Sequence, residues 1–334
     1  MIIWKNSIGS KFIGSFLKEC VARSRSIRCK TRNLSAHEII DFIGEQHFNY
    51  NPKRILNLFS REDIIVPQLI QKKRYKYQFI KNKTMLFKKR KNILLAKDKL
   101  VMLACDQGLE HGPADFNETN IDPAYIVKIA REGQYDAVIL HRGLAEKYYD
   151  GSVPLILKLN GKTSLSKEEP YSPLVFSPRD AYKLGASAVG ITLFLGSKYE
   201  ADCFKDAYHV IEEARKYGLA TIGWMYPRGK DVKDPDHYQT IAYAGRVGQE
   251  LGFDYVKLRE PKQLEHLPWV VKCAGKTKVL MAGGAKMNDK KLKKYLETAS
   301  KSGVSGLAFG RNIWQDPDPL SVTKRVKEYF LTSL

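Results

Sequence analysis

The sequence predicts a closed barrel of eight parallel β/α units, a TIM (β/α)8 barrel, in the part of the chain that begins near residue 100. Short apolar runs of strand character alternate there with longer amphipathic segments of helical character. The alternation continues for about 230 residues, a length that suits one such barrel. An open doubly wound sheet is the alternative. That fold usually brings a glycine-rich GxGxxG turn, and none follows the first apolar run.

The expected strands are spaced so that a helix fits between each strand and the next. The strand-like runs are Leu100–Cys105, Asp136–His141, Pro154–Leu159, Ala188–Phe194, Leu219–Met225, Asp254–Leu258, Lys278–Ala282 and Gly306–Phe309. The amphipathic segments include Tyr199–Tyr217, His237–Leu251, Asp289–Lys301 and Leu320–Phe330. Reactive groups of such barrels lie at the C-terminal ends of the strands, so those positions are the candidates for a site.

The N-terminal part of the chain has a different character. The formal net charge is +20, and the first 100 residues hold 23 Lys and Arg against 7 Asp and Glu. The rest of the chain holds 33 against 29, as a soluble enzyme would. Residues 1–84 also lack the alternation of strands and helices. We therefore expect residues 1–84 to be a basic extension, appended or mis-annotated, and residues 85–334 to be the barrel domain, with Met85 as its natural start.

Two other interpretations of the basic extension remain open. Residues 1–33 are basic, poor in acidic residues and contain several serines, as transit peptides do. Residues 72–77 and 88–91 are rich in Lys and Arg, and aromatic residues interleave with the first cluster. Such segments suit a nucleic-acid-binding arm, for which the barrel would be a scaffold, although charge runs are more often solvated surface.

Composition excludes several classes of protein. No run of about 18 apolar residues occurs, so we expect no membrane span. The cysteines are scattered and form no CxxC pair, which fits reduced thiols in a cytoplasmic protein better than disulfides or a zinc site. They are Cys20, Cys29, Cys105, Cys203 and Cys273.

The loop after the first expected strand concentrates polar residues. Asp106 is placed at the barrel mouth, and Glu110, His111 and Asp115 follow closely. Each of these alone would be an ordinary solvated loop residue. Three acids and a histidine could also suggest a divalent metal ion, but no second histidine stands at ligand spacing nearby. We therefore expect no metal here.

The third and fifth strands each bring polar or aromatic residues to the same end. Lys158 and Leu159 point in opposite directions, so one of them faces the barrel interior. An inward Lys158 would need a carboxylate partner, for which Asp106 is a candidate, whereas an outward one would be ordinary. Trp224 and Tyr226 share one face. A tyrosine there can exchange a proton if a neighbouring cation lowers its pKa, and two core aromatics are the plain alternative.

Lys257 lies near the end of the sixth expected strand, within the run Asp254–Leu258. Burial disfavours the charged form of an amine and frees its lone pair. A neutral amine in that position can attack a sugar carbonyl and form a Schiff base. A solvated lysine at a strand end is the alternative.

Glycines follow the seventh and eighth expected strands. Gly283 and Gly284 come directly after one, and Gly310 and Arg311 directly after the other. Barrels that bind phosphate do so with these two loops, through backbone N–H groups and the start of a short helix. A nucleophilic lysine, a proton-exchanging tyrosine and a phosphate site on one face are the parts of a Schiff-base aldolase that acts on a phosphorylated sugar.

The chain resembles the archaeal-type class I fructose-bisphosphate aldolases over roughly residues 98–330. The resemblance rests on five motifs, namely residues 106–115 (DQGLEHGPAD), 145–163 (AEKYYDGSVPLILKLNGKT), 224–229 (WMYPRG), 279–284 (VLMAGG) and 310–315 (GRNIWQ). Their length and order are specific to that family.

The resemblance implies a role for each matching position. The implied catalytic residues are Lys257 as the Schiff-base lysine, Tyr226 as the proton donor and acceptor, and Asp106. The implied substrate contacts are Gln107, His111, Asp115, Trp224, Arg228 and Arg259. The implied phosphate contacts are Ala282, Gly283, Gly284, Gly310 and Arg311. The resemblance further implies no metal and no cofactor, and a homo-oligomer of up to ten subunits.

Three positions depart from the common archaeal pattern. Gln107 replaces a frequent histidine, Ala282 a frequent serine, and Arg259 a frequent lysine. The serine would have offered one more hydroxyl to the phosphate. None of the three removes a reacting group, but they bear on substrate preference.

The implied reaction is the reversible cleavage of fructose 1,6-bisphosphate to dihydroxyacetone phosphate and glyceraldehyde 3-phosphate, in glycolysis or gluconeogenesis. A synthase of the same family, which makes 2-amino-3,7-dideoxy-D-threo-hept-6-ulosonate, would use the same Lys257 and Tyr226 and stays an alternative. Transaldolase-like and thiolase-like relatives are further options.

Overall fold

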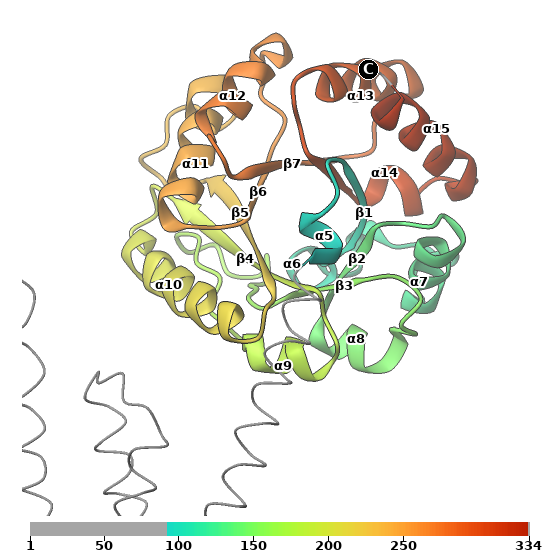
Figure 1. Cartoon of the computed structure of the whole chain (residues 1–334), viewed down its shortest axis with the longest axis horizontal. Helices are drawn as coiled ribbons and strands as arrows, with labels where there is room; N and C mark the ends of the chain where they lie inside the picture. The colour runs from blue at the N-terminus through green and yellow to red at the C-terminus, as the bar shows by residue number, and fades with distance from the viewer. Residues whose placement is uncertain (1–91, 333–334) are drawn as a thin grey trace, which may run out of the picture. The chain divides into compact units, whose positions relative to one another are not determined.

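The computed structural model describes residues 92–332, which form the expected closed barrel (Figure 1). Eight strands pair in sequence order, every neighbouring pair is parallel, and the last strand pairs with the first. The strands are β1 (Leu100–Cys105), β2 (Ala137–His141), β3 (Leu155–Lys158), β4 (Ala188–Leu195), β5 (Ala220–Pro227), β6 (Tyr255–Leu258), β7 (Lys278–Ala282) and β8 (Gly306–Phe309). The prediction of a (β/α)8 barrel is confirmed.

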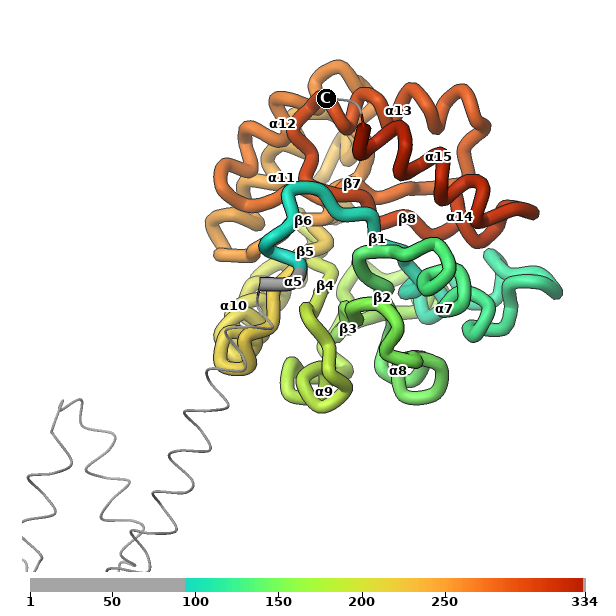
Figure 2. Tube along the Cα trace, turned by 45° about the vertical axis from the view of Figure 1, so that its right-hand side comes forward, coloured from blue at the N-terminus to red at the C-terminus, as the bar shows by residue number. Residues whose placement is uncertain are grey.

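Helices return the chain from each strand to the next and surround the ring (Figure 1). Figure 2 shows β1 beside both β2 and β8. Leu100 of β1 pairs with Gly306 of β8, although more than 200 residues separate them in the chain. The helices are α5 (Asn92–Leu95), α6 (Gly108–His111), α7 (Pro123–Glu132), α8 (Arg142–Tyr148), α9 (Pro178–Lys183), α10 (Glu200–Lys216), α11 (Tyr238–Leu251), α12 (Leu267–Cys273), α13 (Asp289–Lys301), α14 (Arg311–Trp314) and α15 (Pro319–Leu331). Short 3-10 turns cover Gly112–Asp115 and Leu264–His266.

Strand boundaries differ from the predicted ones by at most two residues. The largest difference is at β5, which continues past Met225 to Pro227. The extension has a partner, because residues 224–227 pair in register with residues 192–195 of β4. Tyr226 therefore lies on a strand and has a fixed direction.

Strand geometry creates two cores, because successive side chains point to opposite faces. In β1, Leu100, Met102 and Ala104 point into the barrel, whereas Val101 and Leu103 pack against the helices. The interior core consists of Leu94, Leu100, Met102, Ala104, Ala137, Ile139, Ile156, Ala188, Ala220, Ile222, Trp224, Tyr255, Leu280 and Ala308. The interior is thus filled with side chains, and polar groups enter it only near the strand ends.

The short helix α5 closes the N-terminal end of the barrel, where it lies at the centre of the ring in Figure 1. Leu94 belongs to the interior core, and the hydroxyl of Tyr255 donates a hydrogen bond of 2.9 Å to the Leu94 carbonyl. Lys278 Nζ donates to the carbonyl of Leu95 at 2.9 Å. The N-terminal end of the barrel is therefore covered by α5.

Several expectations fall on residues outside the described range. These are the basic extension of residues 1–84, the start at Met85, the transit peptide and the nucleic-acid-binding arm. Within residues 92–332, no helix combines the length and apolar character needed to cross a membrane.

The Tyr255–Leu94 contact gives a prediction about stability. We expect Tyr255→Phe to lower the free energy of unfolding by about 1 kcal/mol, because the buried Leu94 carbonyl loses one of its two donors and keeps only Lys97 N, while the ring keeps its packing. Urea denaturation measures the change. Tyr208→Phe is the control, since Tyr208 is 65% exposed on α10. Equal stability of the Tyr255 variant and the wild type would contradict the assignment.

Candidate active site

The closed parallel barrel brings every sequence-predicted site residue to one end. Each of them lies at the C-terminal end of a strand or in the loop directly after it. After or on β1 are Asp106, Gln107, His111 and Asp115; on or after β5 are Trp224, Tyr226 and Arg228; on or after β6 are Lys257 and Arg259; after β7 and β8 are Ala282, Gly283, Gly284, Gly310 and Arg311.

Lys257 points into the barrel, because it shares the face of Tyr255 in the interior core. Its side chain is buried, with 6% of the residue exposed. The backbone of Lys257 pairs in register with Trp224 on β5, and its Nζ lies 4.9 Å from the centre of the Trp224 ring. Among the described residues Lys257 Nζ has no hydrogen-bond partner. The amine is therefore buried at the C-terminal end of the barrel rather than exposed to bulk water.

The indole of Trp224 fills the space in front of β4. A β-carbon added at Gly190 would lie only 1.7 Å from Trp224 Cζ3. Glycine at position 190 is therefore what allows the ring to extend from β5 across β4. Gly190 pairs in register with Lys158 on β3, so the ring reaches from the position of one lysine to that of the other.

Lys158 also faces the interior, which was one of the two directions that the sequence allowed. It is 4% exposed, and its Nζ lies 5.3 Å from the centre of the Trp224 ring. The ammonium donates a hydrogen bond of 3.1 Å to the carbonyl of Asn160 rather than to a carboxylate. Asn160 is itself held in place, since its amide nitrogen donates to Thr192 O at 2.8 Å and its oxygen accepts from Thr192 N at 2.8 Å.

The charges of this site act mainly on Asp106 and His141. Burial alone would raise the pKa of Asp106, but the positive charges of Lys257 and Lys158 outweigh it, so the pKa lies below its usual value. Burial, together with the charge of Lys158, lowers the pKa of His141 to about 4. His141 Nε2 lies 3.1 Å from the carbonyl of Asp106. At neutral pH the site thus holds an ionised carboxylate beside a neutral imidazole.

The protonation of Tyr226 differs from the sequence expectation that a cation lowers its pKa. Burial raises the pKa of Tyr226 above its usual value, and the opposing effects of Lys257 and Arg228 are smaller. Arg228 Cζ lies 5.0 Å from the centre of the Tyr226 ring, and Arg228 Nη1 lies 3.7 Å from Glu110 Oε1. Tyr226 is consequently a protonated phenol at neutral pH.

Three buried polar atoms at this end have no hydrogen-bond partner among the described residues. They are Gln107 Nε2, His141 Nδ1 and Trp224 Nε1. Buried polar groups are normally paired, and an unpaired one costs about 1–3 kcal/mol. A ligand with several oxygen atoms would satisfy them, which makes this end of the barrel the candidate binding site.

A hydrogen bond and an ion pair join the loop after β1 to the segment after β8. One oxygen of Asp115 lies 2.7 Å from His111 Nδ1, and the other lies 3.6 Å from Arg311 Nη1. Gln315 donates to the Asp115 carbonyl at 2.8 Å. Both carboxylate oxygens of Asp115 are therefore directed at protein groups.

Asn312 joins the two glycine-containing loops that were predicted to hold phosphate. Its amide nitrogen donates to Gly283 O at 2.7 Å, and its oxygen accepts from Met287 N at 2.7 Å. Gly284 has a φ of +63°, which favours glycine, and Gly310 is the residue before α14. The loops after β7 and β8 thus form one unit, and the backbone N–H groups of Gly284 and Arg311 lie within it.

Arg259 lies directly after β6, at the mouth of the barrel. Arg259 Nη1 lies 2.9 Å from Asp236 Oδ1, so its charge is already paired with a carboxylate of the loop after β5. Within residues 92–332, no group of three or more His, Cys, Asp or Glu side chains is arranged to hold a metal ion.

Sequence reasoning missed three residues of the site, namely His141, Asn160 and Asn312, and left the direction of a fourth, Lys158, open. His141 ends β2 and faces the interior by the same period of two as Ile139, which is a signal that the sequence contained. Lys158 was weighed without a decision on its direction. Asn160 and Asn312 act through contacts with segments far away in the chain, and no local pattern indicates such contacts.

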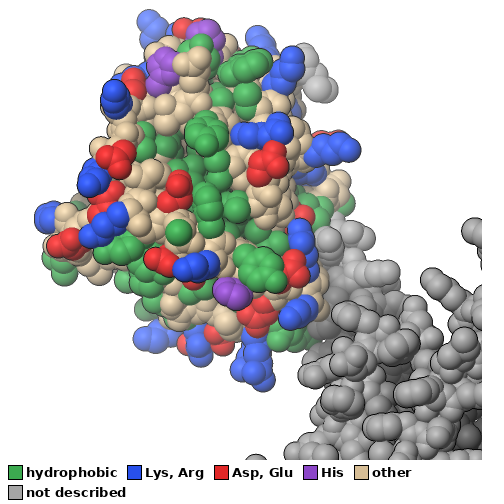
Figure 3. All heavy atoms as spheres, turned by 90° about the vertical axis from the view of Figure 1, so that its left-hand side faces the viewer, with side chains coloured by type: hydrophobic (Ala, Val, Ile, Leu, Met, Phe, Trp, Pro, Cys, Tyr) green, Lys and Arg blue, Asp and Glu red, His purple; other side chains and the backbone are tan. Residues whose placement is uncertain are grey.

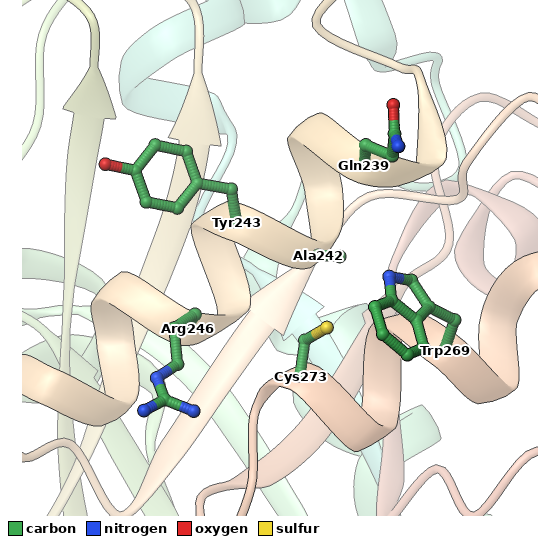
Figure 4. Close-up of a pocket in the computed structure, with 6 residues that line it drawn as sticks. All are labelled: Gln239, Ala242, Tyr243, Arg246, Trp269 and Cys273. Carbon is green, nitrogen blue, oxygen red and sulfur yellow. The ribbon is translucent and has the colours of Figure 1, made fainter.

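A separate hollow of about 290 Å³ lies on the outer surface between α11 and α12. Figure 4 shows its residues, of which Trp269 and Cys273 come from α12 and Gln239, Ala242, Tyr243 and Arg246 from α11. On the same side of the molecule, Figure 3 shows hydrophobic side chains between charged ones. Exposed aromatics such as Tyr243 and Trp269 contribute to this surface, which carries none of the strand-end groups described above.

The model of the "DeoC/LacD family aldolase" family matches residues 100–316, from the first strand to the turn after α14. The chain belongs to this aldolase family.

Two relatives show where the chain falls within the family. It is 44% identical to a class 1 fructose-bisphosphate aldolase of Thermoproteus tenax over 228 residues. These residues are 67% of this chain and 87% of the relative. It is 34% identical over 193 residues, 57% of this chain and 71% of the relative, to 2-amino-3,7-dideoxy-D-threo-hept-6-ulosonate synthase 1 of Archaeoglobus fulgidus.

A solved aldolase has a fold similar to that of this chain. It is an archaeal fructose-1,6-bisphosphate aldolase whose catalytic lysine is covalently bound to the carbinolamine intermediate of the substrate. The two share 42% identity with a TM-score of 0.70, over 73% of this chain and 99% of the other.

The contact between Gly190 and Trp224 gives a prediction for the aldolase site. We expect Gly190→Ala to lower the free energy of unfolding by about 1–3 kcal/mol, because the new methyl group forces the buried indole to move. Denaturant unfolding measures the change.

Two further variants test whether the indole is the cause. In Gly190→Ala with Trp224→Ala, the cost of the first substitution should largely disappear, which a double-mutant cycle detects. Gly143→Ala on α8 is the matched control, since nothing lies within 4 Å of the added carbon. A cost at position 190 that persists without the indole contradicts the prediction.

Proposed function

We propose that this protein is a class I aldolase, a carbon–carbon lyase that reversibly cleaves fructose 1,6-bisphosphate into dihydroxyacetone phosphate and glyceraldehyde 3-phosphate through a Schiff base on Lys257. One observation carries the proposal: a buried lysine with no hydrogen-bond partner among the described residues lies against Trp224 at the open end of the barrel. The family membership and the Thermoproteus tenax relative support the same reaction.

The first steps use Lys257 and Tyr226. The lone pair of the Lys257 amine attacks the C2 ketone, and the Tyr226 phenol protonates the carbinolamine hydroxyl, which leaves as water. The product is a cationic iminium that draws electrons from the sugar chain. Asp106 stabilises this cation, because its carboxylate is ionised and interacts electrostatically with the charge at position 257.

The later steps return each proton to where it began. The Tyr226 phenolate, next to Arg228 and the iminium, accepts the proton of the C4 hydroxyl while the C3–C4 bond breaks and glyceraldehyde 3-phosphate leaves. The phenol then protonates C3 of the enamine. Hydrolysis of the iminium releases dihydroxyacetone phosphate and restores the free amine.

The phosphate groups have candidate donors at the rim. We propose that the backbone N–H groups around Gly283, Gly284 and Gly310, and the Arg311 side chain, bind one phosphate. The bonds of Asn312 to Gly283 and Met287 support this, because they hold the two loops in a fixed relation. Arg228 and Arg259 are candidates for the second phosphate, and His111, Gln107 and Trp224 for the carbon chain.

The proposal extends to the setting of the enzyme. We propose that it acts in the cytoplasm in glycolysis or gluconeogenesis as a homo-oligomer, with a phosphorylated sugar as its partner and no nucleic acid. The thiols of Cys105, Cys203 and Cys273 are free, which supports a reducing compartment. The oligomer rests on the resemblance to the family.

We expect Lys257→Ala to abolish turnover of fructose 1,6-bisphosphate and covalent trapping of the sugar by borohydride, because no other amine in the site takes over the attack. Coupled detection of triose phosphates measures the first, and peptide mapping by mass spectrometry measures the second. Lys205→Ala on α10 is the control, because its side chain is 72% exposed. Wild-type protein that traps the sugar at another lysine would refute the role of Lys257. Trapping without cleavage would favour the heptulosonate synthase instead.

Tyr226→Phe separates proton transfer from imine formation. We expect kcat to fall by about 10²–10⁴-fold while borohydride still traps the sugar on Lys257, because the ring remains but the proton carrier is gone. Stopped-flow or steady-state rates and the yield of trapped adduct are the measurements. Tyr243→Phe on α11 serves as the control, since Tyr243 is 71% exposed on the outer surface. Wild-type rates in the Tyr226→Phe variant would remove Tyr226 from the mechanism.

A further inference from the structure

The loops after β5 and β6 are joined by contacts that strand pairing does not supply. The ladder between these two strands ends at the pair Trp224–Lys257, whereas β5 continues to Pro227. On the other side of β5, the ladder with β4 continues as far as the pair Leu195–Pro227. At the mouth of the barrel, the end of β5 is therefore fastened to β4 by its backbone, and to the segment after β6 by loop residues.

Asp236, in the loop after β5, is held by two residues that follow β6. Its Oδ1 lies 2.9 Å from Arg259 Nη1, and its main-chain carbonyl accepts a hydrogen bond of 2.8 Å from Lys262 N. Lys262 Nζ also donates to Asp234 Oδ1 at 2.8 Å. The Asp236–Arg259 ion pair is thus supported by a backbone bond and by a second ion pair between the same two loops.

An aromatic contact and an amide extend this connection. Tyr238, the first residue of α11, stacks on His266 with 4.0 Å between the ring centres. The backbone N–H of Tyr238 donates to Gln263 Oε1 at 3.4 Å. The Asp236–Arg259 ion pair therefore belongs to a continuous set of contacts between residues 234–238 and residues 259–266, and is not an isolated surface pair.

Burial distinguishes this ion pair from an ordinary one at the surface. Asp236 Oδ1 is shielded from water and has no hydrogen-bond partner among residues 92–332, so Arg259 is the cation that compensates it. A buried carboxylate oxygen that loses its only counter-charge is strongly destabilising. Arg259 consequently cannot leave Asp236 for a phosphate without exposing this cost.

Arg228, at the start of the same loop, is held much less tightly. Its Nη1 lies 3.7 Å from Glu110 Oε1, which is too long for a hydrogen bond, and the Glu110 side chain is 32% exposed. Water can solvate Glu110 when an anion takes the guanidinium of Arg228. Of the two arginines that are candidates for the second phosphate, Arg228 is therefore the one that is free to bind it.

We propose that Arg259 is a positioning residue rather than a phosphate ligand: through Asp236 it holds the loop that begins with Arg228 against the segment after β6. The inference rests on the proposed aldolase function and concerns how the second phosphate of the substrate is received. The contacts order residues 228–237 before a ligand binds, so less conformational freedom is lost on binding. A guanidinium suits this task, because its planar fork pairs with a carboxylate in a fixed geometry.

The variant Asp236→Asn decides between the two roles of Arg259, because they predict opposite results. If Arg259 positions the loop, Asp236→Asn and Arg259→Met should each raise KM for fructose 1,6-bisphosphate by about 10-fold and leave kcat largely unchanged. The double variant should then be no worse than either single variant, since both remove the same ion pair. If Arg259 binds the phosphate, Asp236→Asn releases it for that task, and KM should stay the same or fall.

Two further variants show that the ion pair itself is the cause. Arg259→Lys keeps a cation beside Asp236, so its KM should lie between those of the wild type and Arg259→Met. Glu250→Gln is the matched control: it removes the carboxylate of another arginine pair, with Arg246, on the outer surface of α11, where the Glu250 side chain is 64% exposed. Its KM should equal that of the wild type.

The readouts separate this inference from loss of folded protein and from the proposed function. A variant that is merely less stable loses active enzyme, which lowers the apparent kcat and not the affinity. Wild-type protein that neither cleaves fructose 1,6-bisphosphate nor traps it with borohydride refutes the aldolase function. Normal cleavage by the wild type, together with an unchanged or lower KM in Asp236→Asn, refutes the role of Arg259 alone.

A measurement on the unmodified protein keeps the inference testable if the variants do not fold. Phenylglyoxal modifies arginine side chains, and peptide mapping with and without fructose 1,6-bisphosphate reports which of them the sugar protects. We expect the sugar to protect Arg228 and to leave the slow modification of Arg259 unchanged. Protection of Arg259 and not of Arg228 overturns the proposal.

Discussion

The alternation of side chains along closed strands is the constraint on which the site depends. A barrel interior has room for a few layers of side chains, and here all layers but the last are apolar. The polar groups Lys158, Lys257 and Asp106 are placed where the strands end, with the filled interior below them and loops around them. The same geometry gives Lys158 and Lys257 a low exposure to water and a fixed direction, and places the partly exposed Asp106 next to them. Their electrostatic interactions are strong for that reason.

Much of the fold could be predicted from the sequence, because each strand is an apolar run followed by turn residues, and the runs repeat at helix-length intervals. The end of the barrel that carries Lys257, Tyr226 and Asp106 followed from the strand ends alone. The raised pKa of Tyr226 could not be predicted, since it depends on how much of the ring is covered. The anchoring of Lys158 could not be predicted either. It depends on the carbonyl of Asn160, whose side chain is held by the distant residues Ser172 and Thr192.

The loops around the mouth are joined by side chains that have no role in the proposed chemistry. Asp115 contacts His111 and Arg311, and Asn312 contacts Gly283 and Met287. Asp115 and Arg311 belong to segments that are distant in the chain, and so do Asn312 and its partners Gly283 and Met287, whereas His111 and Asp115 are four residues apart. Because the contacts exist before a ligand binds, the donors for a phosphate are already oriented, and less conformational freedom is lost on binding. A substitution at Asp115 or Asn312 would therefore act on affinity from outside the reacting centre.

The absence of a side chain at Gly190 of β4 bears on how this enzyme could diversify. The indole of Trp224 occupies the room in front of Gly190, so the space beside Lys158 and Lys257 is set jointly by a residue that has no side chain and one that has the largest. Exchanging the bulk between these two strands would reshape that space while Lys257 and its charged neighbours stayed in place. Redesign of the enzyme toward bulkier or shorter aldehydes and ketones would begin with this complementary pair.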